Sequence, residues 1–325
     1  MHTKLSSVEF GALWTTFQKK TMILRILDYL ISTAEDQDAR DLMSGLYEKL
    51  QPKVEEIKTL IKNEGAAIPE GFTDKDVNLK APRLFENGFD IMFTRILKEV
   101  SMGMYVLHMT ISYRQDIIEL YKKLSEITQG YYDQFTAYLI KRDLLPRPNF
   151  TNLPNSITYI EDESYMTGSN FFGSRRPINT VEFGLMYHSV EVNNFAFQLL
   201  RGFSQCATDI EARKYFTKGV NISKEILQGI EKGLLHENIK VPAASGVTVT
   251  NSEIAPFSDR LMMFCTFLFG GFSLGGQGFS STFILRDDVV AKNVVYGKDT
   301  FEYTREGAKL MMKKGWLEEP PKMDL

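Results

Sequence analysis

Two long stretches of this sequence match each other in a single register. Residues 5–69 align with residues 178–242 without a gap, and 12 of the 65 aligned positions are identical. The four-residue run Val-Glu-Phe-Gly at 8–11 recurs intact at 181–184. Each repeat is about 150 residues long, which is the size of one domain. The chain is therefore an internal duplication, and any fold proposed for one half must also suit the other.

The correspondence continues beyond these stretches, with small slips in register. It pairs Pro82 with Pro256, Arg114 with Arg286, Asp116 with Asp288, Lys141 with Lys313, Leu145 with Leu317, and Pro148 with Pro320. Features common to both halves reflect the shared architecture, whereas a feature found in one half alone indicates specialisation.

Apolar residues recur every three or four positions along four segments of the first half, which is the spacing of a helix with one buried face. We expect helices near residues 13–31, 36–64, 84–112 and 114–142, with counterparts in the second half. Strand signals are almost absent, apart from residues 247–249 in a connection. Pro52 lies inside the second helix and should kink or split it, because proline cannot donate a backbone hydrogen bond. The pattern predicts an all-α fold.

The lengths of the connections indicate how these helices are arranged. Few residues separate the first helix from the second and the third from the fourth, so each pair must run antiparallel. The connection over 65–83 is different, because 19 extended residues reach about 60 Å, whereas a helix of about 28 residues is about 42 Å long. Such a connection can cross the whole bundle and leave helices two and three parallel. One long crossover is the ferritin-like arrangement.

Prolines, asparagines and glycines interrupt any helical pattern between the two halves. We therefore predict a first four-helix bundle over residues 1–145, an inter-bundle linker over 146–177 and a second four-helix bundle over 178–325. The linker is rich in aromatic residues, and we expect these to pack across both bundles and fix their orientation: Phe150, Tyr159, Tyr165, Phe171 and Phe172.

Composition narrows the class of protein. The 325 residues carry a formal net charge of −3 with both signs interleaved, so there is no electrostatic reason to expect nucleic acid as a partner. Residues 1–9 lack the apolar core of a targeting signal. Cys206 and Cys265 fall in the second half only, and we expect free buried thiols in a reducing compartment. A cytoplasmic location follows as the expectation.

Several paired motifs together carry a family resemblance. They are the Val-Glu-Phe-Gly openings, the Ile/Val-Pro crossovers, the Tyr/Leu-Arg-x-Asp starts of the fourth helices and the Lys-x-x-x-Leu-x-x-Pro ends. The chain resembles an uncharacterised tandem family of endospore-forming bacteria, catalogued as a domain of unknown function. The resemblance implies two ferritin-like bundles in one chain and, because some members are labelled spore-coat-like, a link to the spore. It implies no catalytic residues.

A ferritin-like bundle raises the question of a di-metal site, which requires inward-facing carboxylates and Glu-x-x-His pairs on two helices. No Glu-x-x-His occurs in the sequence. The nearest set is Glu182, His188 and Glu191 on the fifth helix, and the first half has no equivalent of it. We therefore predict no cofactor, with iron, manganese or zinc at these three residues as the alternative.

Three charged positions are kept in both halves. They are Glu9 and Glu182, Arg114 and Arg286, and Asp116 and Asp288. An acidic residue near a helix start is favoured by the helix dipole, which explains the glutamates and aspartates. We expect structural roles for all six, with Glu9 and Arg114 meeting as an ion pair where helix ends come together.

Residues 261–285 carry no charge and are numerous enough to span a bilayer. The corresponding stretch of the first half contains charges, so we expect a bundle helix that is buried all round, covered by the first bundle or by another subunit. Its glycines would let another helix approach closely. The third helix of the first half should then be the more exposed of the two.

These observations predict a non-catalytic helical-bundle protein that acts through its surface, by self-association or by binding a protein partner, with a spore link implied by the resemblance. Two alternatives stay open: a ferritin-like protein that binds metal or a small ligand, and a membrane-associated protein that uses residues 261–285. Polar groups clustered in the middle of a bundle would favour the first alternative.

Overall fold

The computed structural model describes residues 4–167, 176–241 and 248–323. Its long elements within these ranges are α-helices, four in each half: α1 (Ser7–Thr33), α2 (Gln37–Asn63), α3 (Phe89–Thr110), α4 (Gln115–Lys141), α5 (Thr180–Cys206), α6 (Ile210–His236), α7 (Asp259–Phe283) and α8 (Asp287–Lys313). Two short 3₁₀ helices, η1 (Asp74–Asp76) and η2 (Glu163–Tyr165), lie in connections. The prediction of an all-α fold of two duplicated four-helix bundles is confirmed.

Contacts between helix ends establish the topology of each bundle. The Tyr29 hydroxyl donates to the Pro82 carbonyl at 2.8 Å, which places the end of α1 beside the start of α3. Arg114 at the start of α4 pairs with Glu64 at the end of α2, at 2.5 Å. Helices α2 and α3 therefore run parallel and are joined by a connection that travels the length of the bundle. The Arg286–Glu237 pair shows that the second half repeats this one-crossover topology.

Helix α2 continues through Pro52 as a single element, so the predicted split does not occur. Pro52 lies on the exposed face of the helix. The opposite face buries an unbroken apolar stripe that includes Leu46, Leu50 and Val54. Packing of this stripe outweighs the hydrogen bond that proline removes on the solvent side.

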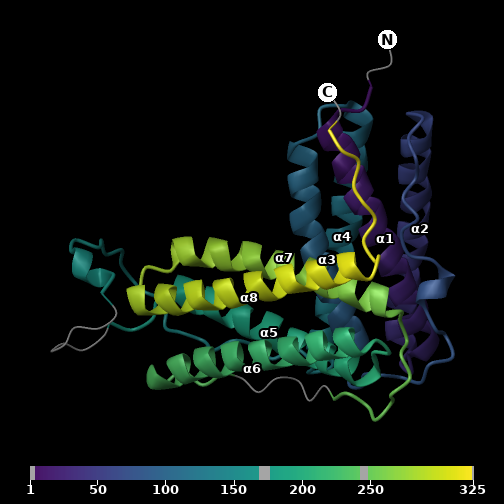
Figure 1. Ribbon diagram of the computed structural model, residues 1–325. Helices are drawn as coiled ribbons and strands as arrows, with labels where there is room; N and C mark the ends of the chain where they lie inside the picture. The colour runs from purple at the N-terminus through teal and green to yellow at the C-terminus, as the bar shows by residue number, and fades with distance from the viewer. Residues whose placement is uncertain (1–3, 168–175, 242–247, 324–325) are drawn as a thin grey trace.

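The two bundles cross each other (Figure 1), and they share a core. Aromatic rings from both halves meet where they cross: the Phe89 and Phe195 rings stack with centroids 5.3 Å apart, and Phe72 packs on Phe264 at 5.1 Å. One continuous apolar cluster contains buried residues from all eight helices, and a second, smaller cluster of α5 and α6 residues lies within the second bundle. The bundles thus form one packed unit, and the two free thiols, Cys206 and Cys265, are buried in it.

The two crossover connections also pair with each other. Val77 pairs with Phe257 and Phe85 pairs with Val249, both as antiparallel bridges. A shift of 172 residues converts Val77 into Val249 and Phe85 into Phe257, so each bridge becomes the other when the halves are exchanged. The connections therefore pair about a local pseudo-two-fold axis.

Backbone hydrogen bonds follow the same symmetry. The Asn78 N–H donates to the Pro256 carbonyl at 2.8 Å, and its exchanged counterpart, the Thr250 N–H, donates to the Leu84 carbonyl at 3.0 Å. Pro256 thus occupies the place of Leu84. The sequence-based pairing of Pro256 with Pro82 is wrong by two residues, because two prolines were matched where the backbone register differs.

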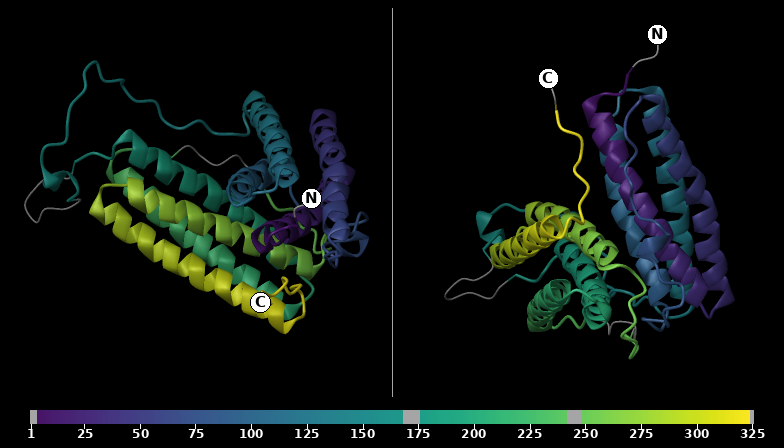
Figure 2. Two further views of the ribbon diagram at one scale, coloured as in Figure 1. Left: turned by 90° about the horizontal axis from the view of Figure 1, so that it is seen from above. Right: turned by 45° about the vertical axis from the view of Figure 1, so that its right-hand side comes forward.

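The linker does not pack between the bundles as predicted. Phe150 and Tyr159 are 92% and 85% exposed, and Figure 2 shows the chain after α4 looping away from both bundles. Tyr165 contacts the start of the second half instead: the Arg176 guanidinium lies 3.9 Å from its ring centroid, and the Asn179 Nδ2 atom donates to its hydroxyl at 3.3 Å. Phe171 and Phe172 lie outside the described residues. The crossovers and the shared aromatic core hold the bundles together instead.

The uncharged stretch 261–285 forms most of α7, which is covered only over its first turns. Residues Leu261 to Thr266 are buried, whereas Phe279 and Phe283 near the far end are 60% and 50% exposed. Helix α3 is the more buried of the two, since 12 of its 22 residues are buried against 7 of 25 in α7. The first bundle therefore does not cover α7 along its whole length, and the expectation that α3 is the more exposed of the two helices is wrong; cover of α7 by another subunit stays a prediction. Of the described helices, α7 is the one long and apolar enough to cross a membrane.

Candidate functional site

The first duplicated glutamate joins the ends of two helices. The Glu9 carboxylate accepts backbone N–H hydrogen bonds from Ser6 at 2.9 Å, from Tyr113 at 2.8 Å and from Arg114 at 2.7 Å. Burial raises the pKa of Glu9, but the bonds from Ser6, Arg114 and Tyr113 outweigh it and lower the pKa to about 2. Glu182 receives the matching bonds from the Leu285 and Arg286 N–H groups.

The Arg114 side chain points to other partners than Glu9. It pairs with Glu64 at the end of α2 and with Asp116 in its own helix, at 2.5 and 2.7 Å. The predicted Glu9–Arg114 ion pair is therefore wrong: the arginine meets Glu9 through its backbone N–H. The second half repeats the arrangement with Arg286, Glu237 and Asp288. Glu64 and Glu237 are identical in the aligned register, which is the signal that could have revealed them.

The three residues considered for a metal do not come together. Glu182 lies in the cap at the start of α5. The His188 Nε2 atom lies 2.5 Å from an oxygen of Glu99 on α3, so this pair links the two bundles and raises the pKa of His188. Burial raises the pKa of Glu191. Among the described residues no group of three or more His, Cys, Asp or Glu is arranged to hold a metal ion.

A layer of polar residues lies inside both bundles at equivalent positions. Residues of α1 and α5 correspond by a shift of 173, and those of α3 and α4 correspond to α7 and α8 by a shift of 172. Three equivalent pairs keep a hydroxyl side chain: Thr16 and Ser189, Ser101 and Ser273, and Thr128 and Thr300. Four further pairs stay polar but differ in side chain: Lys20 and Asn193, Tyr105 and Gln277, His108 and Ser280, and Tyr121 and Asn293. This is the mid-bundle cluster that favours a binding role.

Large side chains fill this layer in the first bundle. Lys19 and Lys20 place their Nζ atoms 4.1 and 4.9 Å from the Tyr105 ring centroid, and both are buried together with Lys98. Burial lowers the pKa of all three lysines, that of Lys98 to about 7, and the Lys98 charge lowers the pKa of Lys19 and Lys20 further. The interior of the first bundle is thus basic rather than acidic.

A hydrogen-bonded group completes the layer of the first bundle. The Thr16 hydroxyl lies 3.1 Å from His108 Nδ1 and 3.2 Å from the Tyr121 hydroxyl. Burial lowers the pKa of His108 to about 4, and the neighbouring Lys19 contributes to the same shift. This imidazole is therefore neutral at physiological pH and acts as a hydrogen-bonding group.

Smaller residues open a pocket at the same level of the second bundle. Asn193 and Gln277 take the places of Lys20 and Tyr105. The empty space at this site is about 940 Å³ when the open solvent at its mouth is counted with it. All four helices of the second bundle contribute to its wall, among them Met186, Ile230, Gly233, Phe272, Gly276, Ser280 and Tyr296. Replacement of bulky interior residues by glycine, serine and amide side chains thus creates room that the first bundle lacks.

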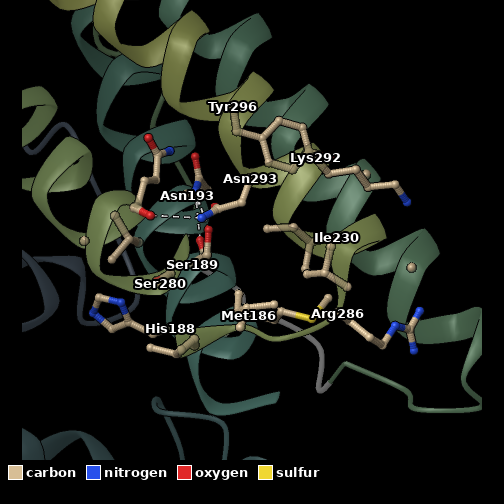
Figure 3. A pocket seen from close by; sticks show the side chains of 18 of the residues that line it. Met186, His188, Ser189, Asn193, Ile230, Ser280, Arg286, Lys292, Asn293 and Tyr296 are labelled. Carbon is tan, nitrogen blue, oxygen red and sulfur yellow. Dashed lines mark hydrogen bonds between the residues drawn. The ribbon is translucent and has the colours of Figure 1, made fainter. Parts of the chain in front are cut away.

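Amide side chains line one side of this pocket (Figure 3). The Asn193 Nδ2 atom donates to the Ser189 carbonyl at 2.8 Å, and Asn293 Nδ2 donates to the Ser281 hydroxyl at 2.7 Å. Gln277 donates to the Thr300 hydroxyl at 3.3 Å, while its buried Oε1 atom has no hydrogen-bond partner among the described residues. The pocket therefore combines apolar walls with amide side chains, one of which has a buried oxygen without a partner among the described residues.

Comparison with known proteins places the chain in a family. No curated protein matches it. A solved structure of a Bacillus halodurans C-125 protein, provisionally designated a spore coat protein, is 17% identical and has a TM-score of 0.44; the match covers 46% of this chain and 97% of the other. A family model described as a protein of unknown function (DUF3231) matches residues 1–156 and again residues 166–324. The chain therefore belongs to this family of unknown function and contains two copies of its domain.

Proposed function

We propose that this protein binds one small, largely apolar molecule in the pocket of its second bundle. The observation that carries the proposal is the contrast between the two interiors at equivalent positions. Lys20 and Tyr105 fill the first interior, whereas Asn193 and Gln277 leave the second one open. Ligand sites are typically concave and apolar with a few placed polar groups, and this pocket has that character.

The polar groups of the pocket indicate the chemistry of its ligand. The Gln277 Oε1 atom is a buried acceptor without a partner, so a ligand that offers a hydroxyl or amide N–H would satisfy it. Arg286 contributes to the lining but is paired with Glu237 and Asp288. Lys292 also lines the pocket, but Figure 3 shows its side chain extending away from Asn193. The neutralised Arg286 and the apolar walls therefore support an uncharged molecule with an apolar body and one donor group.

A variant that copies the first bundle into the second tests this proposal. Ser280→His combined with Asn293→Tyr introduces the residues found at His108 and Tyr121, and the larger side chains should occupy the pocket. We expect the full-length variant to fold and to lose at least about tenfold in affinity for an uncharged apolar dye such as Nile red, measured by fluorescence titration.

A matched control places the same side chains on the surface. Thr282→His and Lys298→Tyr are exposed positions of the same two helices, α7 and α8. This control should bind the dye as the wild type does. Equal dye binding by the filled variant and the wild type would show that the dye does not use the pocket, and the proposal would fail.

A protein that binds a small molecule in this pocket can also bind other proteins through its surface. Self-association or binding of a protein partner, and an association with the spore, stay predictions from the sequence. Immunodetection in purified spores and in vegetative cells of the source organism tests the spore link. Detection in vegetative cells alone would contradict it.

A further inference from the structure

Three amino groups lie inside the first bundle without an opposite charge. Lys19, Lys20 and Lys98 are at most 1% exposed. No carboxylate of the described residues contributes to their electrostatic environment, and Lys98 repels the other two. Lysines are almost never fully buried unless they are paired, so three together are not explained by packing alone.

Hydrogen bonding leaves the same groups unsatisfied. The Nζ atoms of Lys20 and Lys98 have no hydrogen-bond partner in the part of the chain that the structure describes. Lys19 reaches only the sulfur of Met104, at 3.5 Å, which is a weak acceptor. Loss of protons would remove the repulsion but would leave these N–H donors unpaired. A bound anion would both neutralise the positive charges and accept hydrogen bonds from the N–H groups, because it supplies negative charge and several acceptor atoms.

We propose that the first bundle binds a small anion, a carboxylate or an inorganic oxyanion, between Lys20 and Lys98 beside the Tyr105 ring. Lys20 comes from α1 and Lys98 from α3, so the anion would bridge two helices that otherwise repel each other at this level. Lys19, with its Nζ atom 4.1 Å from the same ring, contributes a third positive charge.

The second bundle provides an internal comparison for this site. Val192, Asn193 and Gly270 stand where the first bundle has Lys19, Lys20 and Lys98. The equivalent level there contains no cationic side chain from these positions, and it lines the pocket proposed for an uncharged ligand. The anion site is therefore specific to the first half, and its existence does not depend on the ligand of the second.

Thermal unfolding of the full-length protein with added anions tests the proposal. Sodium phosphate and sodium acetate are titrated separately at pH 7 and constant ionic strength, after overnight equilibration because the site is buried. We expect a saturable rise in Tm of about 2–4 °C at ten times the half-saturating concentration. A rise with phosphate alone identifies an inorganic oxyanion, and a rise with acetate alone identifies a carboxylate.

Two substitutions locate the effect. Lys98→Met and Lys20→Met remove one amine each while keeping a long apolar side chain, and both should lose the saturable rise. Lys122→Met, an exposed position on α4, should keep it. Absence of a saturable rise in the wild type with either anion would overturn the proposal. So would an equal rise in both interior variants, because the anions would then act elsewhere.

Discussion

At the scale of single residues, the same position has been given different chemistry in the two halves. Glu9 and Glu182 keep one role, since each accepts backbone N–H groups at the start of the fourth helix of its bundle. Lys20 and Asn193 do not, although both lie in the middle of a bundle. Residues that tie helix ends are therefore common to both halves, whereas residues that face the interior have diverged.

Neutralising Glu9 should make the protein less stable in a pH-dependent way. The folded-state pKa of Glu9 is about 2, below its ordinary value of 4.5. The carboxylate therefore contributes stability that is present above about pH 4.5 and lost as the pH falls toward 2. We expect Glu9→Gln to lower the free energy of unfolding at pH 7 by about 2 kcal/mol, measured by urea denaturation.

An exposed glutamate supplies the control for this measurement. Glu48→Gln removes a carboxylate from the surface of α2 and should change the free energy of unfolding by less than about 0.5 kcal/mol. Below pH 2 the Glu9→Gln protein and the wild type should become equally stable. A deficit for Glu9→Gln that is unchanged between pH 7 and pH 3 would contradict the role assigned to the charge.

At the scale of elements, the crossovers do more than connect parallel helices. Each passes along its own bundle and then pairs with the other crossover through the Val77–Phe257 and Phe85–Val249 bridges. The Tyr29 hydroxyl fastens the first crossover to α1, because it donates to the Pro82 carbonyl and accepts from the Leu84 N–H at 2.9 Å.

Removing that hydroxyl should loosen the pairing of the crossovers. Tyr29→Phe keeps the ring against Phe257 but leaves the Leu84 N–H without its acceptor. We expect a loss of about 1–3 kcal/mol in the free energy of unfolding and faster amide hydrogen exchange at Leu84. Tyr113→Phe, at a side chain that is 81% exposed, should have no such effect. Unchanged exchange at Leu84 would mean that Tyr29 does not hold the crossover.

Helices and connections were predictable because they leave periodic and length-dependent traces in the sequence. The apolar stripe through Leu46 and Leu50 specified α2, and the length of residues 65–83 specified the crossover. The interior layer could not be predicted, because lysines such as Lys19 and Lys20 usually lie on the surface and the sequence alone does not show their burial. Alignment of Lys20 with Asn193 and of Tyr105 with Gln277 was available from the duplication, but only the fold shows that these positions face inward.

At the scale of the whole molecule, the shared core holds the two halves together, whereas the exposed linker only connects them covalently. Rings such as Phe89 and Phe195 make one core from both bundles. The chain between α4 and α5 contributes little of it, since Phe150 and Tyr159 are exposed. The covalent connection over this stretch is therefore not what keeps the two bundles together.

Proteolytic cleavage of the linker tests whether the core alone holds the two bundles together. Limited chymotrypsin digestion should cleave after Phe150 or Tyr159, the exposed aromatic residues of the linker. We expect the two fragments to elute together at the size of the intact protein in gel filtration, because their interface is a packed core. Fragments that separate without denaturant would show that the linker is required. Phe89→Ala in the same experiment should weaken the association.

The pseudo-two-fold pairing of the crossovers has a consequence for how the chain can evolve. A two-fold homodimer built on the same Val–Phe bridges would use one sequence for both subunits, so any change in one interior would appear in the other. In a tandem chain the two copies mutate independently while the paired crossovers keep their geometry. One half can therefore keep a basic, filled interior while the other half opens a pocket. A single gene then encodes two different bundles that always assemble with each other.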